Sequence, residues 1–227
     1  MWLDYLANTT TLLPGTAVEF IYRPQTGTHN AVEATIALIE EGIIAMMGST
    51  YSSATTFTAY VTGASHIPQC CGSSTSPALS SKTEYPFFFR TLSNDNLQAV
   101  AMFEYILFNG WKRVSVIYED SSYGLGLYLA FTSEAAKHVS FNIISTNLVK
   151  TDEDNIIGDR LPILRSIAAN DVYIIVLFGW LATFVKAGTS LQMRTSQYAW
   201  IGSDSMYSAD MVSQDGMVVF YGSSGFL

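Results

Sequence analysis

The sequence predicts an α/β fold with a mainly parallel sheet and helices on both of its faces. Short apolar runs typical of strands alternate along the chain with longer stretches whose apolar residues have helical spacing. Hydrophobic residues make up 49% of the 227-residue chain and charged residues only 13%, so much of the chain must be buried. Strict alternation implies right-handed crossovers and parallel pairing, and in such folds ligands bind at the carboxyl ends of the strands.

The expected elements follow one another along nearly the whole chain. The helix over 94–110 has the clearest pattern, with an Asn or Asp start, apolar residues at helical spacing from Leu97 to Ile106, and a glycine at its end. A helix over 29–42 also ends at a glycine. Helical patterns occur between the later strands. The remaining expectations are a helix over 52–65 and strands over 17–24, 43–48, 67–72, 113–120, 139–149, 172–179 and 198–204.

Charge and motifs exclude several classes of protein. The net charge of −8, without a basic cluster, argues against a nucleic-acid partner. Neither a Walker loop, nor a G-x-S-x-G elbow, nor a metal pair is found, so we expect no enzyme and no cofactor. The most apolar run, residues 172–185, has 14 residues and is too short for a bilayer. The first ten residues lack the pattern of a signal peptide.

The cysteines and histidines indicate no disulfide and no zinc site. Cys70 and Cys71 are adjacent, and neighbouring cysteines rarely bridge because their side chains diverge along a strand. We therefore expect two thiols in or beside a buried strand. His29, His66 and His138 are far apart and have no cysteine at the spacing of a zinc ligand set.

Two hydroxyl-rich stretches mark expected strand ends. In "GSTYSSATTF", residues 48–57, seven of ten residues carry a hydroxyl, and the stretch lies between a strand and a helix. Backbone N–H groups and the helix dipole attract anions at a helix N-terminus, and hydroxyls add donors there. The alternative is an ordinary N-cap, which needs one such residue. "CGSSTSPALS", residues 71–80, repeats the pattern, but loops are often rich in serine, so composition leaves both readings open.

Several short motifs of the sequence resemble those of a known family. The phrases "GIIAMMGSTYSSAT", "IPQ", "SSTSPALS", "YPFFFRT", "NGWKRVSVIYED", "YG" and "YAWIGSD" occur in the family's order over nearly the whole chain. Together they resemble the ligand-binding region of family C receptors and their relatives. These include metabotropic glutamate, GABA-B and natriuretic-peptide receptors and bacterial branched-chain amino-acid-binding proteins.

The resemblance implies two doubly wound, Rossmann-like lobes around a cleft, the periplasmic-binding-protein type I or Venus-flytrap architecture. Lobe 1 would cover residues 1–108 and lobe 2 residues 109–227. It also implies that the family's first strand and its final crossings back to lobe 1 are missing, with 17–24 matching the family's second strand. We therefore expect the chain alone to be poorly soluble and lobe 2 to be its better-ordered half, because a lost inner strand leaves unpaired edges.

The resemblance also implies how a ligand carboxylate is held. Residues matching the family's α-carboxylate contacts are Ser52 and Thr75, with backbone N–H groups of Ser53 and Ser73 nearby. Hydroxyls that face each other from two strand ends have little structural use, so this part of the match is the least ambiguous.

The matches on the ammonium side are Asp95 and Tyr123, with Asp204 closing from lobe 2. Each has a structural alternative. Asp95 would cap the helix over 94–110, Tyr123 would pack over the hinge, and Asp204 would belong to a turn in "GSDS". Glutamate sensors carry a cation after the "GSD" motif, whereas this chain has "SMYSAD". Glutamate is therefore not favoured, and a neutral or small amino acid is at least as well supported.

The function implied is that of an ANF-receptor-type ligand-binding domain of a membrane receptor, which binds an amino acid or analogue and signals by cleft closure. The partners implied are a second receptor subunit and a membrane domain outside this chain, with the cleft on the extracellular side of the plasma membrane. Asn8, in "NTT", is a possible glycosylation site. The alternatives are a soluble periplasmic-type binder and a vestigial cleft used for dimerisation.

Overall fold

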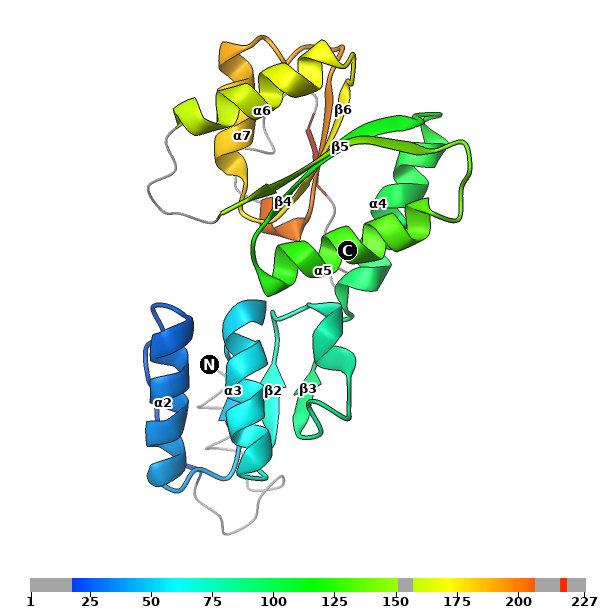
Figure 1. Cartoon of the computed structure of the whole chain (residues 1–227). Coiled ribbons are helices and arrows are strands. Elements are labelled where there is room, and N and C mark those ends of the chain that lie inside the picture. Colours follow the sequence, from blue (N-terminus) through cyan, green and yellow to red (C-terminus); the bar gives the residue numbers. More distant parts are fainter. Residues whose placement is uncertain (1–17, 151–156, 207–216, 220–227) are drawn as a thin grey trace.

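The chain forms two parallel sheets, each with its own helices (Figure 1). The computed structural model describes residues 18–150, 157–206 and 217–219. One sheet has three strands in the order β1-β2-β3, and the other has five in the order β5-β4-β6-β7-β8. All neighbouring strands in these two sheets pair in parallel. The predicted α/β class with parallel pairing is confirmed.

The three-stranded unit contains short strands and two long helices that lie side by side (Figure 1). Its buried cluster is small and consists of Ala59, Cys71, Leu79, Tyr85 and Phe88. As expected, both cysteines are free thiols in β2. The elements are α2 (Thr28–Glu40), β1 (Met46–Met47), α3 (Ser52–Ala64), β2 (Gln69–Cys71), the 3-10 turn η1 (Pro77–Ser80) and β3 (Phe88–Arg90).

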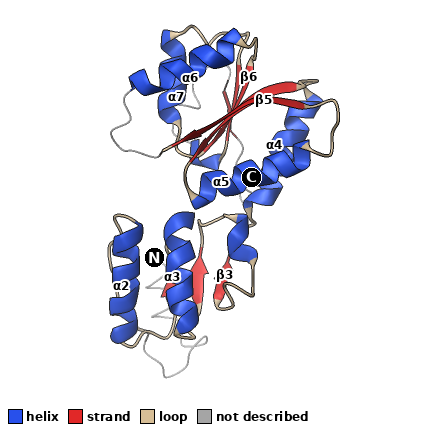
Figure 2. Cartoon of the chain, in the orientation of Figure 1, coloured by secondary structure: helices blue, strands red, loops and turns tan. Residues whose placement is uncertain are grey.

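The five-stranded unit is doubly wound and holds most of the core (Figure 2). Buried residues of β4 and β6 alternate between its faces. On one face Val116 and Val176 pack with α4 and α5, and on the other Ile117 and Leu177 pack with α6 and α7. The elements are α4 (Asp95–Phe108), β4 (Arg113–Glu119), α5 (Ser122–Ala135), β5 (Asn142–Val149), α6 (Ile157–Ala169), β6 (Ile174–Phe178), α7 (Ala182–Ser190), β7 (Ala199–Gly202), the 3-10 turn η2 (Asp204–Met206) and β8 (Met217–Val219).

Local signals place the helix ends close to their predicted positions. The side chain of Asn94 caps α4 by accepting a hydrogen bond from the Asn96 backbone N–H at 3.0 Å. Gly42 and Gly110 follow α2 and α4 with φ of 83° and 72°, a conformation that glycine adopts without strain. Within the described residues, no helix combines the length and apolar character needed to cross a bilayer.

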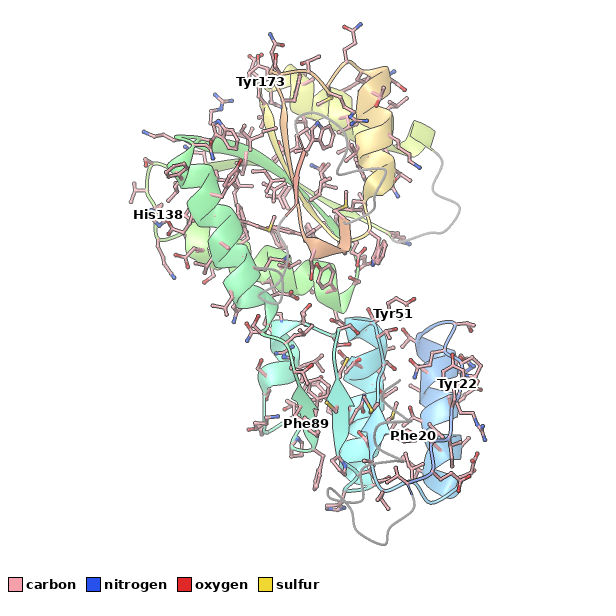
Figure 3. The ribbon with its side chains drawn as sticks, turned by 180° about the vertical axis from the view of Figure 1, so that it is seen from behind. Phe20, Tyr22, Tyr51, Phe89, His138 and Tyr173 are labelled. Carbon is pink, nitrogen blue, oxygen red and sulfur yellow. The ribbon has the colours of Figure 1, made fainter. Side chains whose placement is uncertain are left out.

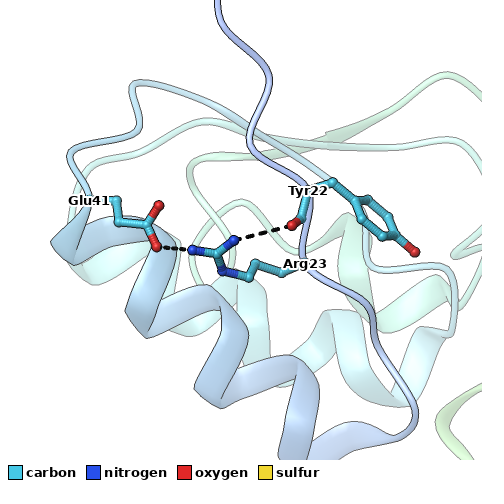
Figure 4. A network of polar contacts seen from close by, with 3 residues as sticks. All are labelled: Tyr22, Arg23 and Glu41. Carbon is cyan, nitrogen blue, oxygen red and sulfur yellow. Dashed lines mark hydrogen bonds and ion pairs between the residues drawn. The ribbon is translucent and has the colours of Figure 1, made fainter.

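The strand expected over residues 17–24 is wrong for its described part, residues 18–24. This segment pairs with neither sheet, and Val18, Phe20 and Tyr22 are 50%, 49% and 82% exposed (Figure 3). Arg23 forms an ion pair with Glu41, just after α2, and donates to the Tyr22 carbonyl at 3.3 Å (Figure 4). A strand needs a hydrogen-bonded neighbour, and β1-β2-β3 offers none to this segment among the described residues.

Helix α4 packs with the second unit, although the expected division at residue 108 places it in lobe 1. Its buried residues Ala99, Met102, Phe103 and Ile106 share one cluster with β4, α5 and β6. This packing favours a division of the chain between β3 and α4. Residues 1–17 and the expected glycosylation site at Asn8 lie outside the described residues.

The packing of Phe103 generates a stability prediction. Its ring is fully buried and meets those of Phe131 and Phe141 with centroids 5.6 and 4.8 Å apart. Phe103→Ala should lower the free energy of unfolding by about 3–5 kcal/mol, because the substitution leaves a cavity that the surrounding side chains fill only partly. Leu97→Ala on the same helix, where Leu97 is 60% exposed, should change it by less than about 0.5 kcal/mol. Urea unfolding checks both, and equal losses would contradict this packing.

Candidate functional site

A cleft of about 900 Å³ lies between the two units. Its lining comes from the residues that follow the carboxyl ends of β1, β2, β4, β6 and β7, together with the start of α2. The predicted location of a site at the carboxyl ends of the strands agrees with this arrangement. The lining residues are Thr26, Gly27, Thr28, Thr50, Tyr51, Ser52, Ser53, Ser73, Thr75, Glu119, Ser121, Tyr123, Trp180, Asp204 and Ser205.

Two helices begin at the cleft without a side-chain cap. Gly27 precedes α2 and Tyr51 precedes α3, and neither contributes a side-chain hydrogen bond to the first turn. The first turns of both helices also contain no acidic residue. The first backbone N–H groups of a helix have no intrahelical acceptor, so these ends offer donors and a positive dipole end to the cleft.

Part of the hydroxyl-rich stretch joins the turn after β1 to the turn after β2. The Ser49 carbonyl accepts hydrogen bonds from the Thr55 and Ser74 hydroxyls, each at 3.2 Å, and from the Cys71 thiol. The Ser52 hydroxyl accepts from the Ser76 backbone N–H at 3.2 Å. These contacts hold the two turns together, so several hydroxyls of this stretch have a structural use that the sequence did not reveal.

Thr75 and Asp95 form a buried polar pair at the base of this wall. They are 5% and 2% exposed, and Thr75 Oγ1 and Asp95 Oδ2 have no hydrogen-bond partner among the described residues. The Asp95 backbone N–H donates to the Thr75 carbonyl at 3.0 Å, whereas the helix is capped by Asn94. The structure therefore does not support the alternative that Asp95 is the cap of α4.

Burial is the largest influence on the pKa of the Asp95 carboxyl. It raises the pKa of the Asp95 carboxyl to about 7. The Thr75 hydroxyl, although not in hydrogen-bond geometry, lowers this pKa, the charge of Asp204 raises it, and the guanidinium of Arg90 lowers it. Asp95 does not line the cleft itself, but its charge acts on the groups that do.

The opposite wall pairs Tyr123 with Asp204. The Tyr123 hydroxyl, at the start of α5, donates to Asp204 Oδ1 at the start of η2. Burial and the charges of Asp204 and Asp95 raise the pKa of Tyr123 well above its ordinary value, so the phenol keeps its proton. Tyr123 therefore has a specific polar partner, the carboxylate of Asp204, in addition to its packing contacts.

Glu119, the last residue of β4, also lines the cleft and is 4% exposed. Its Oε1 accepts from the Ser121 hydroxyl at 2.6 Å and its Oε2 from the Trp180 backbone N–H at 2.8 Å. None of the described residues that line the cleft is Lys, Arg or His. The described residues also contain no group of three His, Cys, Asp or Glu that could hold a metal ion.

The comparison with protein families gives a match over almost the entire sequence. The model described as "Receptor family ligand binding region" matches residues 1–226. The chain belongs to this family. The resemblance described from the sequence is therefore confirmed.

Curated relatives in this family are receptors. Glutamate receptor 3.1 of Oryza sativa subsp. japonica is 27% identical over 87% of this chain and 21% of its own length. Glutamate receptor 3.7 of Arabidopsis thaliana is 31% identical over 74% of this chain and 18% of its own length. Metabotropic glutamate receptor 6 of Rattus norvegicus is 27% identical over 73% of this chain and 19% of its own length. The chain thus spans about a fifth of the length of these relatives.

Six of the seven residues predicted from the sequence line this cleft, and the seventh, Asp95, lies next to Thr75. The six are Ser52, Ser53, Ser73, Thr75, Tyr123 and Asp204. The sequence did not single out Glu119, Trp180 or Tyr51. An acidic residue that ends a buried strand, as Glu119 does in "VIYED", was the signal that would have found the first of these.

The pKa of Asp95 generates a prediction about stability and pH. Because the folded pKa of about 7 lies above the ordinary value of about 3.9, the stability that Asp95 contributes is complete below pH 4 and is lost as pH rises through 7. Asp95→Asn does not titrate. Its unfolding free energy relative to the native chain should therefore rise by a few kcal/mol between pH 4 and pH 8.

Urea unfolding at several pH values measures this difference. Glu104→Gln is the matched control, because Glu104 is exposed on the same helix and its charge interacts mainly with water. Parallel pH profiles for Asp95→Asn and the native chain would contradict a raised pKa.

Proposed function

We propose that the chain binds a free α-amino acid, or a close analogue, in the cleft between its two units. The observation that carries the proposal is the chemical contrast between the cleft walls. The wall from the three-stranded unit presents hydroxyls and uncapped helix starts, and the wall from the five-stranded unit presents Glu119 and Asp204. An α-amino acid carries a negative and a positive group on adjacent atoms and matches both walls.

The carboxylate is assigned to the wall that contains Ser52, Ser53, Ser73 and Thr75. The hydroxyl of Thr75 is buried and has no hydrogen-bond partner among the described residues. An unpaired buried hydroxyl costs free energy, and this cost is relieved when the hydroxyl donates to a ligand oxygen. The uncapped start of α3 adds backbone donors and a favourable dipole. These groups bind a carboxylate without a fixed positive charge.

The ammonium group is assigned to Asp204 and Tyr123, with Asp95 behind Thr75. Asp204 uses one oxygen for Tyr123, which orients its carboxylate. An ammonium group near Asp95 favours the ionised form of that carboxyl, because an opposite charge lowers a carboxyl pKa. Burial therefore raises the pKa of Asp95, whereas a bound ammonium group lowers it.

Closure of the cleft follows from the distribution of these contacts over two units. A ligand that touches both walls gains its full set of contacts only when the walls are close, so it shifts the population toward the closed arrangement. In a receptor of this family, we propose that the closure is passed to a second subunit and to a membrane domain, with the cleft on the extracellular side.

The first prediction from this proposal concerns the ligand carboxylate. An L-α-amino acid should bind the full chain, and the matching amine without the carboxylate should bind at least tenfold more weakly, because the hydroxyl wall then has no anion. Isothermal titration calorimetry with each amino acid of a panel and its decarboxylated analogue is the measurement. Equal affinities within such pairs would remove the carboxylate from the proposed site.

The second prediction concerns single residues. Thr75→Ala should weaken amino-acid binding about tenfold or more, because a hydrogen bond to a charged group contributes about 1.5–3 kcal/mol. Asp95→Asn should have an effect of similar size, because it removes a negative charge behind Thr75 that attracts the ligand ammonium group. Thr75→Ala should leave the melting temperature nearly unchanged, since its hydroxyl has no partner among the described residues. Thr83→Ala, an exposed threonine before β3, is the control and should bind like the native chain. A collapse in the melting temperature of Thr75→Ala would show that this residue is structural.

A further inference from the structure

The five-stranded wall of the cleft holds a second acidic position that the proposed contacts to an α-amino acid do not use. Glu119 ends β4, is 4% exposed and lines the cleft. Its carboxylate accepts hydrogen bonds from the Ser121 hydroxyl and the Trp180 backbone N–H, both of which are neutral donors. Among the described residues, no Lys, Arg or His lies within ion-pair distance of it. A carboxylate accepts about four hydrogen bonds, so Glu119 has remaining capacity toward the cleft.

Two glycines leave the space that the side chain of Glu119 occupies. A Cβ at Gly124 would lie 2.6 Å from Glu119 Cγ, and a Cβ at Gly179 would lie 2.4 Å from its Cδ. Gly179 also has φ of 128°, which residues with a side chain rarely adopt. The carboxylate therefore lies between the turns after β4 and β6, at a place where only glycine leaves enough space for it.

Aromatic side chains accompany this carboxylate. Trp180, whose backbone N–H donates to Glu119, lines the cleft and is 65% exposed. Tyr51, which lines the other wall and is labelled in Figure 3, is 54% exposed. Large aromatic residues that remain exposed in a cleft are common in binding sites, and their ring faces attract organic cations. Carboxylate together with indole is a combination suited to an ammonium or guanidinium group.

The charges around the cleft point in the same direction. Its described lining includes Glu119 and Asp204 and no basic side chain, while Thr75, 5% exposed, leaves its hydroxyl unpartnered for the ligand carboxylate. A metal ion is not favoured as the positive group, because the described residues contain no set of three metal-ligating side chains. A ligand with a single ammonium group would neutralise Asp204 and leave Glu119 buried without a counter-charge, which is costly.

We propose that the ligand is a basic amino acid whose side-chain ammonium or guanidinium group docks between Glu119 and Trp180. This inference rests on the proposed amino-acid function of the same cleft and adds the class of side chain. It also revises the expectation of a neutral ligand that the absence of a cation after "GSD" supported. In glutamate sensors the protein supplies the cation for the ligand side chain. In this proposal the ligand side chain carries the cation, and Glu119 supplies the negative charge.

The test compares ligands that differ in charge but little in shape, by calorimetry on the full chain. L-Arginine is paired with L-citrulline, which replaces the guanidinium group by a neutral urea, and L-lysine is paired with L-norleucine. The charged member of at least one pair should bind at least tenfold more tightly. Glu119→Gln should reduce that ratio about tenfold while the affinity for the neutral member changes little.

A second variant guards against misfolding of Glu119→Gln, whose side chain is buried. Trp180→Leu removes the exposed indole but keeps the backbone N–H that binds Glu119, and it should lower the charged-to-neutral ratio severalfold. Equal binding of both members in both pairs overturns the inference and leaves the amino-acid function intact. If no α-amino acid of the panel binds, the proposed function fails and the inference fails with it.

Discussion

Parallel pairing of neighbouring strands in both sheets is the constraint on which the cleft depends. A parallel strand must be followed by a crossover, so the carboxyl ends of all strands in a sheet lie along one edge. The turns at that edge are free of the ladder, and each is followed by a helix start with unpaired N–H groups. In this chain the edges of both sheets contribute to the same cleft, so residues as distant in sequence as Ser52 and Asp204 line one cavity.

The hydroxyl-rich turn after β1 combines support and recognition. Thr55 is committed to the Ser49 carbonyl, which with Ser74 and Cys71 ties this turn to the one after β2. The hydroxyl of Thr75 is buried and has no hydrogen-bond partner in the part of the chain that the structure describes. A rigid network beside an unsatisfied hydroxyl is the arrangement expected of a preorganised binding group, because its donor does not have to be ordered when a ligand arrives.

The sequence predicted what depends on local signals and missed what depends on tertiary neighbours. Helix α4 was predictable because Asn94, its apolar spacing and Gly110 all act within a few residues. The segment from 18 to 24 has strand-like composition, but strand formation needs a partner that local sequence does not reveal. The short strands β3 and β8, with three residues each, were not predicted for the same reason. Glu119 was missed because its burial between Gly124 and Gly179 is created only by folding.

The contrast between the two walls also determines which ligands favour closure in the proposed function. A simple anion gains contacts only from the hydroxyl wall, and a simple amine only from the wall with Asp204 and Glu119. Either one binds the open and closed arrangements with similar affinity and shifts no population. A molecule that carries both charges gains from closure because one wall then completes the contacts of the other. In the proposed function, recognition is therefore coupled to closure through the charge separation within the ligand, because Glu119 and Asp204 lie on one wall and the described lining contains no basic side chain.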